Sequence, residues 1–195
     1  MTDHLRCPAD HPEGFLVLLP DEIADRSVVR GRLGCPVCGR TFPVEHGTVA
    51  LGSAPRLDEP ATRIPPGGLG SLLGLTGPGG YVAIVGRAAE ALAQEDLPGV
   101  NLVLFNPPPG LSVESASNLV GDRLGLRSGS VRGVVLGPGY GSQARWLEEA
   151  RRVVLPGLRV VGEGPRPAGS GWEVLASADG VWVATPSGRL PGSGA

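Results

Sequence analysis

The sequence contains no lysine, so every one of its strongly basic side chains is an arginine. A phosphate-binding loop of the GxxxxGK[ST] type and any Schiff-base mechanism both need an ε-amino group, and both are therefore excluded. No apolar run approaches the length of a membrane span. The opening residues, MTDHLRCPAD, lack the charged and apolar regions of a signal peptide. We therefore expect a cytoplasmic protein with no membrane partner.

Charge and cysteine are also scarce. The formal net charge is −2, which gives no general electrostatic reason to expect a nucleic-acid partner. The three cysteines cannot pair evenly, and in a reducing compartment they are better interpreted as metal ligands or redox thiols than as disulfides. The 32 glycines and 20 prolines would suggest disorder, but an apolar share of 41% and several clean strand-like runs indicate a folded chain.

The pattern along the chain predicts two domains. Residues 1–52 contain all the cysteines and histidines among short β-like runs, and residues 53–67 are rich in proline and charge, as linkers are. Residues 68–187 alternate strand-like runs with helix or loop, and residues 188–195 form a flexible tail.

Within the second domain, five apolar runs predict parallel strands buried on both faces, at 81–86, 101–106, 117–120, 131–137 and 158–164. The runs at 172–177 and 181–186 flank an Asp-Gly turn and predict an antiparallel hairpin. Helices are expected at 69–75, 87–94 and 142–155, the last capped by Ser142 and stopped by Pro156.

The first domain carries a metal-site pattern. Cys35 and Cys38 form a CPVC knuckle, and an earlier Cys-Pro turn begins at Cys7, far enough away for a hairpin to lie between them. This spacing is typical of a zinc ribbon, in which two knuckles direct four ligands at one tetrahedral ion. The fourth ligand is either Asp10, by CxxC counting, or His11, by CxxxH counting, and we favour His11 because imidazole is the commoner zinc partner.

Two other interpretations of these cysteines and His11 remain open. The ribbon could have lost its metal, leaving Cys7 buried and His11 on the surface. A thioredoxin-like redox role for CPVC is weaker, because no βαβ unit surrounds it. His46 is expected in a turn. If all four ligands bind zinc, the site is closed to water and its zinc is structural rather than catalytic.

The stretch LGCPVCGRTFPVEHGTVALG resembles the zinc-ribbon family of small methyltransferase activator subunits and their bacterial relatives. In that family a CPxC knuckle is followed by an aromatic-Pro-Val/Ile strand and an Asp-Gly turn, where this chain has His46 in place of the aspartate. The resemblance covers about the first quarter of the chain.

From about residue 68 to 186 the chain resembles class I S-adenosylmethionine (SAM)-dependent methyltransferases. The resemblance is carried by NLVGDRLGLRSGSVRGVVLGPG and ARWLEEARRVVLPGLRVVGEG, which match the family's segments from the third strand to the fifth. It implies an α/β fold: a small β zinc ribbon followed by a pruned Rossmann-like, mostly parallel methyltransferase sheet that ends in an antiparallel hairpin.

The first motif of that family is degenerate here. The family places a carboxylate in the first strand and glycines in the following loop, so that the backbone can approach the cofactor. This chain has Ile84 for the carboxylate and Ala88 and Glu90 near the expected glycines, so only Gly86 remains.

The second cofactor position is also changed. The second strand should end in Asp or Glu to bind the ribose hydroxyls, but it ends in Asn106, which lacks the charge. Asp122 alone matches, at the residue expected near adenine. Gly86, Asn106 and Asp122 therefore form a vestigial SAM site.

No catalytic residue can be assigned. After the fourth strand, Tyr140 could stack on a substrate, but Gly137 offers no acceptor for an amine, so we interpret Tyr140 as a core or loop residue. No histidine lies in this domain to act as a base.

The segments that should hold the crossover helices after the second and fifth strands are too short or too rich in proline and glycine. Missing helices leave apolar surface on a parallel sheet, which predicts a protein partner or a homodimer there. Trp146, Trp172 and Trp182 are assigned to core or interface, with core favoured.

These patterns favour a non-catalytic, methyltransferase-like protein with a structural zinc site, acting as a structural or regulatory subunit. The first alternative is an active SAM-dependent methyltransferase with a divergent cofactor site, since the family relies largely on positioning its substrates. The second is a zinc-ribbon nucleic-acid module using Arg26, Arg30, Arg32 and Arg40, which lacks stacking aromatics beside the arginines.

Overall fold

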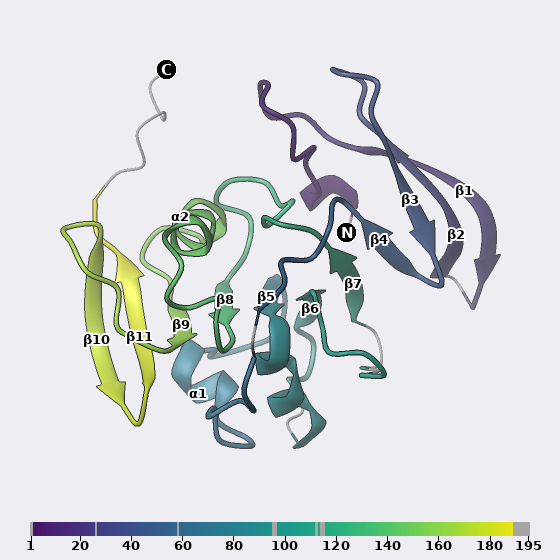
Figure 1. Ribbon diagram of the computed structural model, residues 1–195. Coiled ribbons are helices and arrows are strands. Elements are labelled where there is room, and N and C mark those ends of the chain that lie inside the picture. Colours follow the sequence, from purple (N-terminus) through teal and green to yellow (C-terminus); the bar gives the residue numbers. More distant parts are fainter. Residues whose placement is uncertain are drawn as a thin grey trace.

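The computed structural model describes residues 2–25, 27–57, 59–94, 97–111, 113 and 116–188. Its named strands all join one eleven-stranded sheet, in the order β1-β2-β3-β4-β7-β6-β5-β8-β9-β11-β10 (Figure 1). The strands are β1 (Val17–Ala24), β2 (Ser27–Gly34), β3 (Thr41–Glu45), β4 (Thr48–Ala50), β5 (Tyr81–Val85), β6 (Asn101–Phe105), β7 (Ser117–Val120), β8 (Gly133–Leu136), β9 (Val160–Glu163), β10 (Trp172–Ala178) and β11 (Val181–Pro186).

Helix is sparse in the described residues. It comprises two 3-10 segments, η1 (Thr2–His4) and η2 (Gly86–Gln94), and two α-helices, α1 (Leu69–Leu73) and α2 (Ala144–Val153). The expected Ser142 cap is wrong, because Gln143 takes the cap position of α2 and makes no side-chain capping bond. None of the helices in these residues is long and apolar enough to cross a membrane.

The expected α/β fold with a Rossmann-like, mostly parallel sheet is wrong. Among the described strands, five neighbouring pairs are parallel and five are antiparallel, in a single mixed sheet. The main cause is β4, which pairs in parallel with the outer edge of β7 through Thr48–Asn118, Val49–Leu119 and Ala50–Val120. The amino-terminal β-ribbon, β1 to β4, therefore extends the sheet, and few crossover helices flank it.

The centre of the sheet is parallel. Strands β7, β6, β5, β8 and β9 are neighbours in that order, so the direction of winding reverses between β5 and β8. At such a reversal the connections leave on opposite faces, and a crevice forms beside the carboxyl ends of the strands. Residues 82–85 of β5 are fully buried, as a central strand covered on both faces must be.

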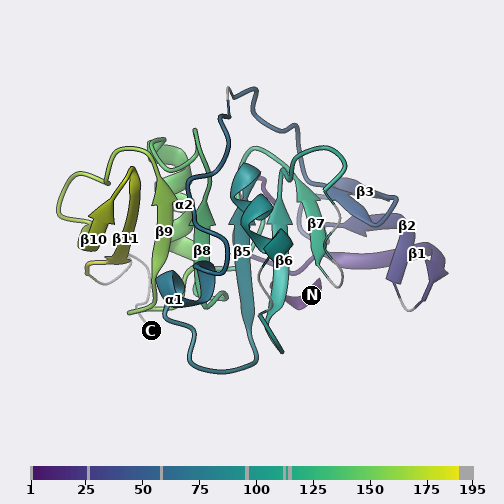
Figure 2. The same ribbon diagram turned by 90° about the horizontal axis from the view of Figure 1, so that it is seen from below.

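The two faces of the parallel centre have different covers. Leu69 and Leu73 of α1 pack with Ala88 of η2 against one face, and Trp146 and Val153 of α2 pack against the other. Figure 2 shows α1 and η2 in front of the strands and α2 behind them. Trp146 and Trp182 are core residues, as expected, and Trp172 is half-buried.

The two ends of the sheet are the edge strands β1 and β10. Each of these strands is irregular, since the register shifts between Pro20 and Ile23 in β1 and between Val174 and Ala176 in β10. The hairpin expected at the carboxyl end is present, and Asp179 and Gly180 form its turn with positive φ angles of 53° and 76°.

Candidate functional site

The structure brings together four potential metal ligands in the amino-terminal part of the chain. Cys7 and His11 lie on the loop before β1, and Cys35 and Cys38 lie on the turn between β2 and β3. One ligand atom from each residue lies within 4.8 Å of all the others. The four side chains are therefore close enough to bind one metal ion. Asp10, the alternative fourth ligand, does not join this cluster in the described residues.

Two contacts define the geometry of the cluster. Cys7 Sγ lies 3.7 Å from Cys38 Sγ, and Cys35 Sγ lies 3.4 Å from His11 Nε2. His11 Nδ1 lies 2.7 Å from the carbonyl oxygen of Pro12, which accepts a hydrogen bond when Nδ1 carries the proton. This is the tautomer that leaves Nε2 free to bind a metal, with its ring orientation fixed by a carbonyl.

The knuckle turn prepares Cys35 for ionisation. The N–H of Gly39 donates to the Cys35 carbonyl at 2.9 Å, and Gly39 supplies the positive φ of 71° that the turn requires. Burial opposes the Cys35 thiolate, but hydrogen bonds from the backbone N–H groups of Cys38 and Val37 outweigh it, and the pKa of Cys35 falls to about 7. Cys7 differs, because burial raises its pKa to about 11 despite the nearby N–H of Ala9.

The remaining histidines lie elsewhere. His46 occupies the turn between β3 and β4 with a φ of 49°, as the sequence pattern predicts, and its side chain is exposed. His4 belongs to η1, where its ring packs against Tyr81 at 4.4 Å between centroids.

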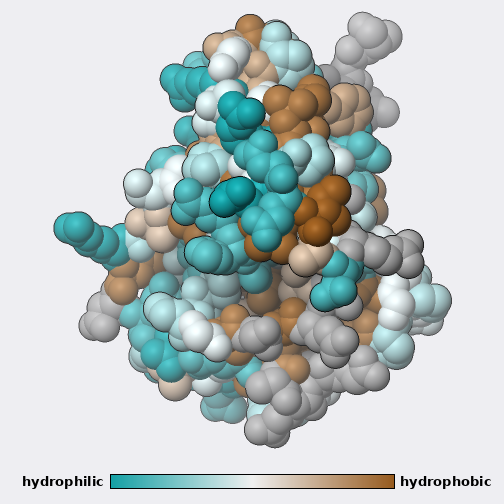
Figure 3. All heavy atoms as spheres, turned by 90° about the vertical axis from the view of Figure 1, so that its right-hand side faces the viewer, coloured by the Kyte–Doolittle hydropathy of each residue, from teal (hydrophilic) through white to brown (hydrophobic). Residues whose placement is uncertain are grey.

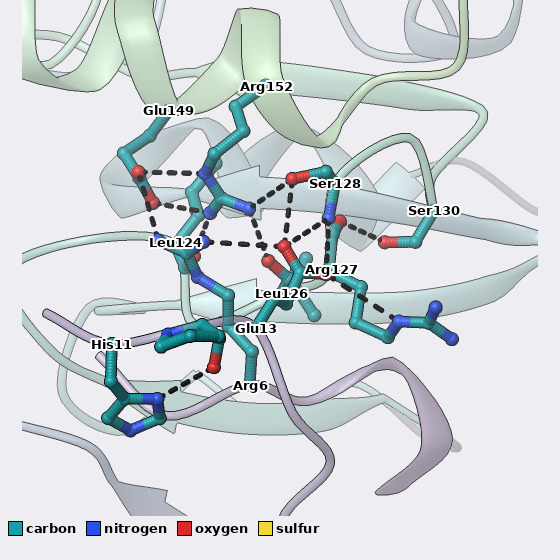
Figure 4. A network of polar contacts seen from close by, with 11 residues as sticks. Arg6, His11, Glu13, Leu124, Leu126, Arg127, Ser128, Ser130, Glu149 and Arg152 are labelled. Carbon is teal, nitrogen blue, oxygen red and sulfur yellow. Dashed lines mark hydrogen bonds and ion pairs between the residues drawn. The ribbon is translucent and has the colours of Figure 1, made fainter. Parts of the chain in front are cut away.

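A polar network ties the metal loop to the rest of the molecule (Figure 4). The Glu13 carboxylate accepts bonds from the N–H and O–H of Ser128 at 3.0 and 2.9 Å and pairs with Arg6 at 3.4 Å. Arg152 of α2 pairs with Glu149 and donates to two backbone carbonyls of the same 124–128 loop. The loop that carries Cys7 and His11 is thereby anchored to α2.

Gly86, the first of the predicted cofactor residues, lies at the carboxyl end of β5 with a φ of 65°. A Cβ atom there would overlap the Glu59 carboxylate and the Tyr140 ring. Glu59 comes from the segment expected to be a linker, and its Oε2 accepts a hydrogen bond from the Arg87 N–H at 3.1 Å. The turn after β5 is thus occupied by the chain's own carboxylate.

Asn106, the second predicted cofactor residue, lies at the carboxyl end of β6 with a φ of 49°, and it is buried. Its Nδ2 donates to the Gly121 carbonyl at 2.8 Å, and its Oδ1 accepts from the Gly121 N–H at 3.0 Å. Both ends of the amide are therefore engaged in joining the end of β6 to the end of β7.

Asp122, the third predicted cofactor residue, follows β7 at the same edge of the sheet. Its Oδ2 accepts a bond from Arg145 at 2.6 Å, and both side chains are about half exposed, 48% and 47%. An exposed pair of this kind contributes little stability. The structure therefore places Gly86, Asn106 and Asp122 at one edge, with each in contact with another part of the chain.

Two carboxylates at this edge were missed by sequence reasoning, Glu59 and Glu163. Glu163 ends β9 and is only 2% exposed, with Oε1 accepting from the Thr62 hydroxyl and Oε2 from the Arg63 N–H, each at 2.6 Å. A single acidic residue at the end of an apolar strand could have signalled a polar edge, but nothing in the sequence identified its partners 100 residues away.

Burial controls the ionisation of these groups. It raises the pKa of Glu163 despite hydrogen bonds from Thr62 and the Arg63 backbone, and it raises the pKa of Glu59 in the same way. It also raises the pKa of Tyr140, which is 1% exposed and packs edge-on against Trp146 at 4.8 Å. Tyr140 is thus a core residue, as the sequence suggested.

No protein-family model matches the chain, and no curated protein matches it in sequence.

The Asn106 clamp gives a first prediction. Asn106→Asp tolerates the positive φ but loses the donor to Gly121 and sets a carboxylate oxygen against a carbonyl oxygen. We expect it to lower the free energy of unfolding by about 1–3 kcal/mol in urea titrations at pH 7. Asn101→Asp is the matched control, because Asn101 makes a comparable bond to Gly80 at an exposed site, and its effect should stay within about 0.5 kcal/mol. Equal losses in the two variants would contradict the clamp.

The raised pKa of Glu163 gives a second prediction. The native state holds this proton more tightly than the unfolded state, so the stability that Glu163 contributes is complete below pH 4.5 and is lost as the pH rises through the native pKa. Glu163→Gln removes this titration. The unfolding free energy of the wild type relative to Glu163→Gln should therefore decrease from pH 4.5 upward, as measured by urea unfolding at stepped pH.

Glu173→Gln, at an exposed position of β10, is the control for changing one carboxylate to an amide. The prediction would be wrong if the unfolding free energy of the wild type, relative to Glu163→Gln, increased with pH. That result would show that the surroundings of Glu163 stabilise its ionised form.

Proposed function

We propose that the protein is a non-catalytic, methyltransferase-like subunit that holds a structural zinc ion and acts through contacts with another protein. The main support is Asn106. It stands where a nucleotide-binding relative would present a carboxylate to the ribose, yet both of its amide atoms are bound to Gly121. A side chain held in this way is committed to the backbone of Gly121 and lacks the negative charge of the carboxylate it replaces, so we interpret Asn106 as a structural residue.

The rest of the crevice supports the same conclusion. Gly86 lies under Glu59, Ile84 is fully buried in place of the family's carboxylate, and Asp122 is paired with Arg145. A cofactor would have to break the contacts of Gly86 and Asp122 and would still lack the charge-assisted bonds that hold ribose. We therefore propose that SAM is not a ligand of this protein.

The donor set supports zinc as the metal. Three thiols and one imidazole make up a common structural zinc site. Zinc–sulfur bonds of about 2.3 Å at a tetrahedral ion place neighbouring sulfur atoms about 3.8 Å apart. The 3.7 Å between Cys7 Sγ and Cys38 Sγ fits this spacing. With four protein ligands no position is open for water, so the ion would stabilise the fold, and a reducing compartment such as the cytoplasm would keep the thiols available.

Exposed apolar side chains beside the metal cluster support a protein partner. Phe15, Val17 and Leu19 alternate with the buried Leu16 and are each 51% exposed, and Val37 on the knuckle is 55% exposed. Figure 3 shows apolar atoms gathered among hydrophilic ones on the end of the molecule that carries β1 and β2. We propose that this apolar stripe contributes to the contact, either with a different protein or with a second copy of the chain.

The alternative of an active methyltransferase retains one favourable observation, the reversal of winding between β5 and β8, which is where parallel sheets of this kind hold their ligands. Calorimetric titration of the zinc-loaded protein with SAM and with S-adenosylhomocysteine separates the two. We expect no heat of binding at ligand concentrations near 1 mM, which corresponds to about −4 kcal/mol. Binding in the micromolar range, about −8 kcal/mol, would overturn the proposal, since the crevice would then hold its cofactor without the missing carboxylates.

Zinc binding is expected to require His11. The metal-free chain should take up one equivalent of zinc in competition with a chromophoric chelator, and His11→Ala should weaken binding roughly a hundredfold, since four ligands share about 10–16 kcal/mol. His46→Asn is the matched control, because asparagine tolerates the positive φ of that turn. A loss of affinity on Asp10→Asn, with none on His11→Ala, would instead assign Asp10 as the ligand.

A further inference from the structure

The segment between β4 and α1 crosses the carboxyl edge of the parallel strands (Figure 2). Residues 59–64 of this segment, which we call the strap, make specific contacts with the strand ends beneath them. The strap contains no helix or strand, so side-chain contacts and single backbone bonds hold it in place.

The first contact is made by Glu59. Its carboxylate accepts a hydrogen bond from the Arg87 N–H at 3.1 Å, at the start of η2, and another from the Tyr140 hydroxyl. The absence of a side chain at Gly86 makes room for this carboxylate, because a Cβ there would overlap it. Glu59 therefore takes the place at the β5 turn where an anionic ligand would otherwise approach.

The second contact lies two strands away, at the end of β9. Glu163 accepts bonds from the Thr62 hydroxyl and the Arg63 N–H, each at 2.6 Å. The Ile64 N–H donates to Thr62 Oγ1 at 3.2 Å, and the Ile64 side chain is 3% exposed in the core on the α1 face. One buried carboxylate and one buried apolar side chain thus fix the far end of the strap.

Between these two contacts the strap is poorly packed. Pro60 and Ala61, the two residues between the contacts, are exposed, and a cavity of about 120 Å³, which the exposed Arg63 also lines, separates them from the 138–142 loop. Segments with few buried apolar contacts and exposed backbone open more easily than the core around them. The strap is therefore held at two points and bridges a gap between them.

Burial of the carboxylates that hold the strap opposes tight closure. Burial is the main cause that raises the pKa of both Glu59 and Glu163, and it does so despite hydrogen bonds from the backbone and side chains around them. The charge of Glu90, which pairs with Arg87 at 2.7 Å, adds least. While the strap is closed, the carboxylates are partly removed from water, which raises the free energy of their ionised forms. Opening the strap would return them to water and remove this cost.

We propose that the strap is a two-point latch that closes the crevice from within the chain and detaches as a unit, while the sheet stays folded, to expose the strand ends. This inference deepens the proposed function by naming what closes the crevice. The latch depends on the proposed function in one respect only, the proposal that no nucleotide binds at these strand ends.

Native-state proteolysis of the full, zinc-loaded chain tests the latch. Trypsin can cut the peptide bond between Arg63 and Ile64 only when the strap has detached from the strand ends beneath it. Mass spectrometry distinguishes this cut from cuts at other arginines. Thr62→Val and Glu59→Gln each weaken one contact, and each should speed cleavage at this bond roughly tenfold or more. Thr41→Val, on the exposed side of β3, is the matched control and should leave the rate unchanged.

A core variant distinguishes local from global opening. Val134→Ala truncates a fully buried side chain of β8 on the face opposite Ile64, so it should lower global stability in urea. If the strap opens alone, Val134→Ala leaves cleavage after Arg63 unchanged, and that cleavage depends only weakly on urea. If cleavage follows global unfolding, it accelerates in Val134→Ala in proportion to the lost stability, and the latch is overturned.

Calorimetric titration of Glu59→Gln with S-adenosylhomocysteine, combined with the cleavage rates, tests the latch and the non-catalytic function separately. Rapid cleavage with no heat of binding supports both. Rapid cleavage with binding that the wild type lacks retains the latch but overturns the non-catalytic assignment. Unchanged cleavage in both latch variants overturns the latch and leaves the argument from Asn106 untouched.

Discussion

The parallel pairing of β4 with β7 is the constraint on which the rest of the structure depends. Only three residue pairs form it, yet they make the amino-terminal ribbon a continuation of the sheet. Because β4 runs parallel to its neighbour, the chain leaves it at the carboxyl edge of the parallel strands. The next central strand, β5, must be entered from the opposite edge. The intervening segment therefore has to pass from the carboxyl edge of the sheet to the opposite edge, and the strap is the part of it that lies over the strand ends.

Local pattern was sufficient for the elements and the metal cluster. Apolar runs located the strands of the second half, and the two Cys-Pro turns named the residues whose ligand atoms converge. The pairing of β4 with β7 could not be read in this way, because strand periodicity shows which face is buried and says nothing of which neighbour lies alongside. The expected Rossmann-like sheet failed at this point. The bond between Arg63 and Glu163 was equally inaccessible, since it joins residues 100 positions apart.

The positions predicted to form a cofactor site are occupied by contacts within the chain. Gly86, in the turn after β5, has a positive φ, and Asn106 is itself in the left-handed region. Glu59 accepts a bond from the Arg87 N–H at this turn, and the Asn106 amide is bonded to Gly121. An amide suits the end of β6 because it can both donate to and accept from one peptide group, whereas a carboxylate can only accept.

The irregular edge strands have a consequence for how molecules of this protein could associate. An open sheet with a free strand at each end is a repeating unit that could grow end to end, since each edge offers unpaired backbone groups to another molecule. In β1, Pro20 removes one donor and the register shift bends the strand beside it, and β10 carries a shift of its own. Each end is therefore a poor template for adding a further molecule. The irregular edges therefore oppose end-to-end pairing of the eleven-stranded sheets of different molecules into a fibre.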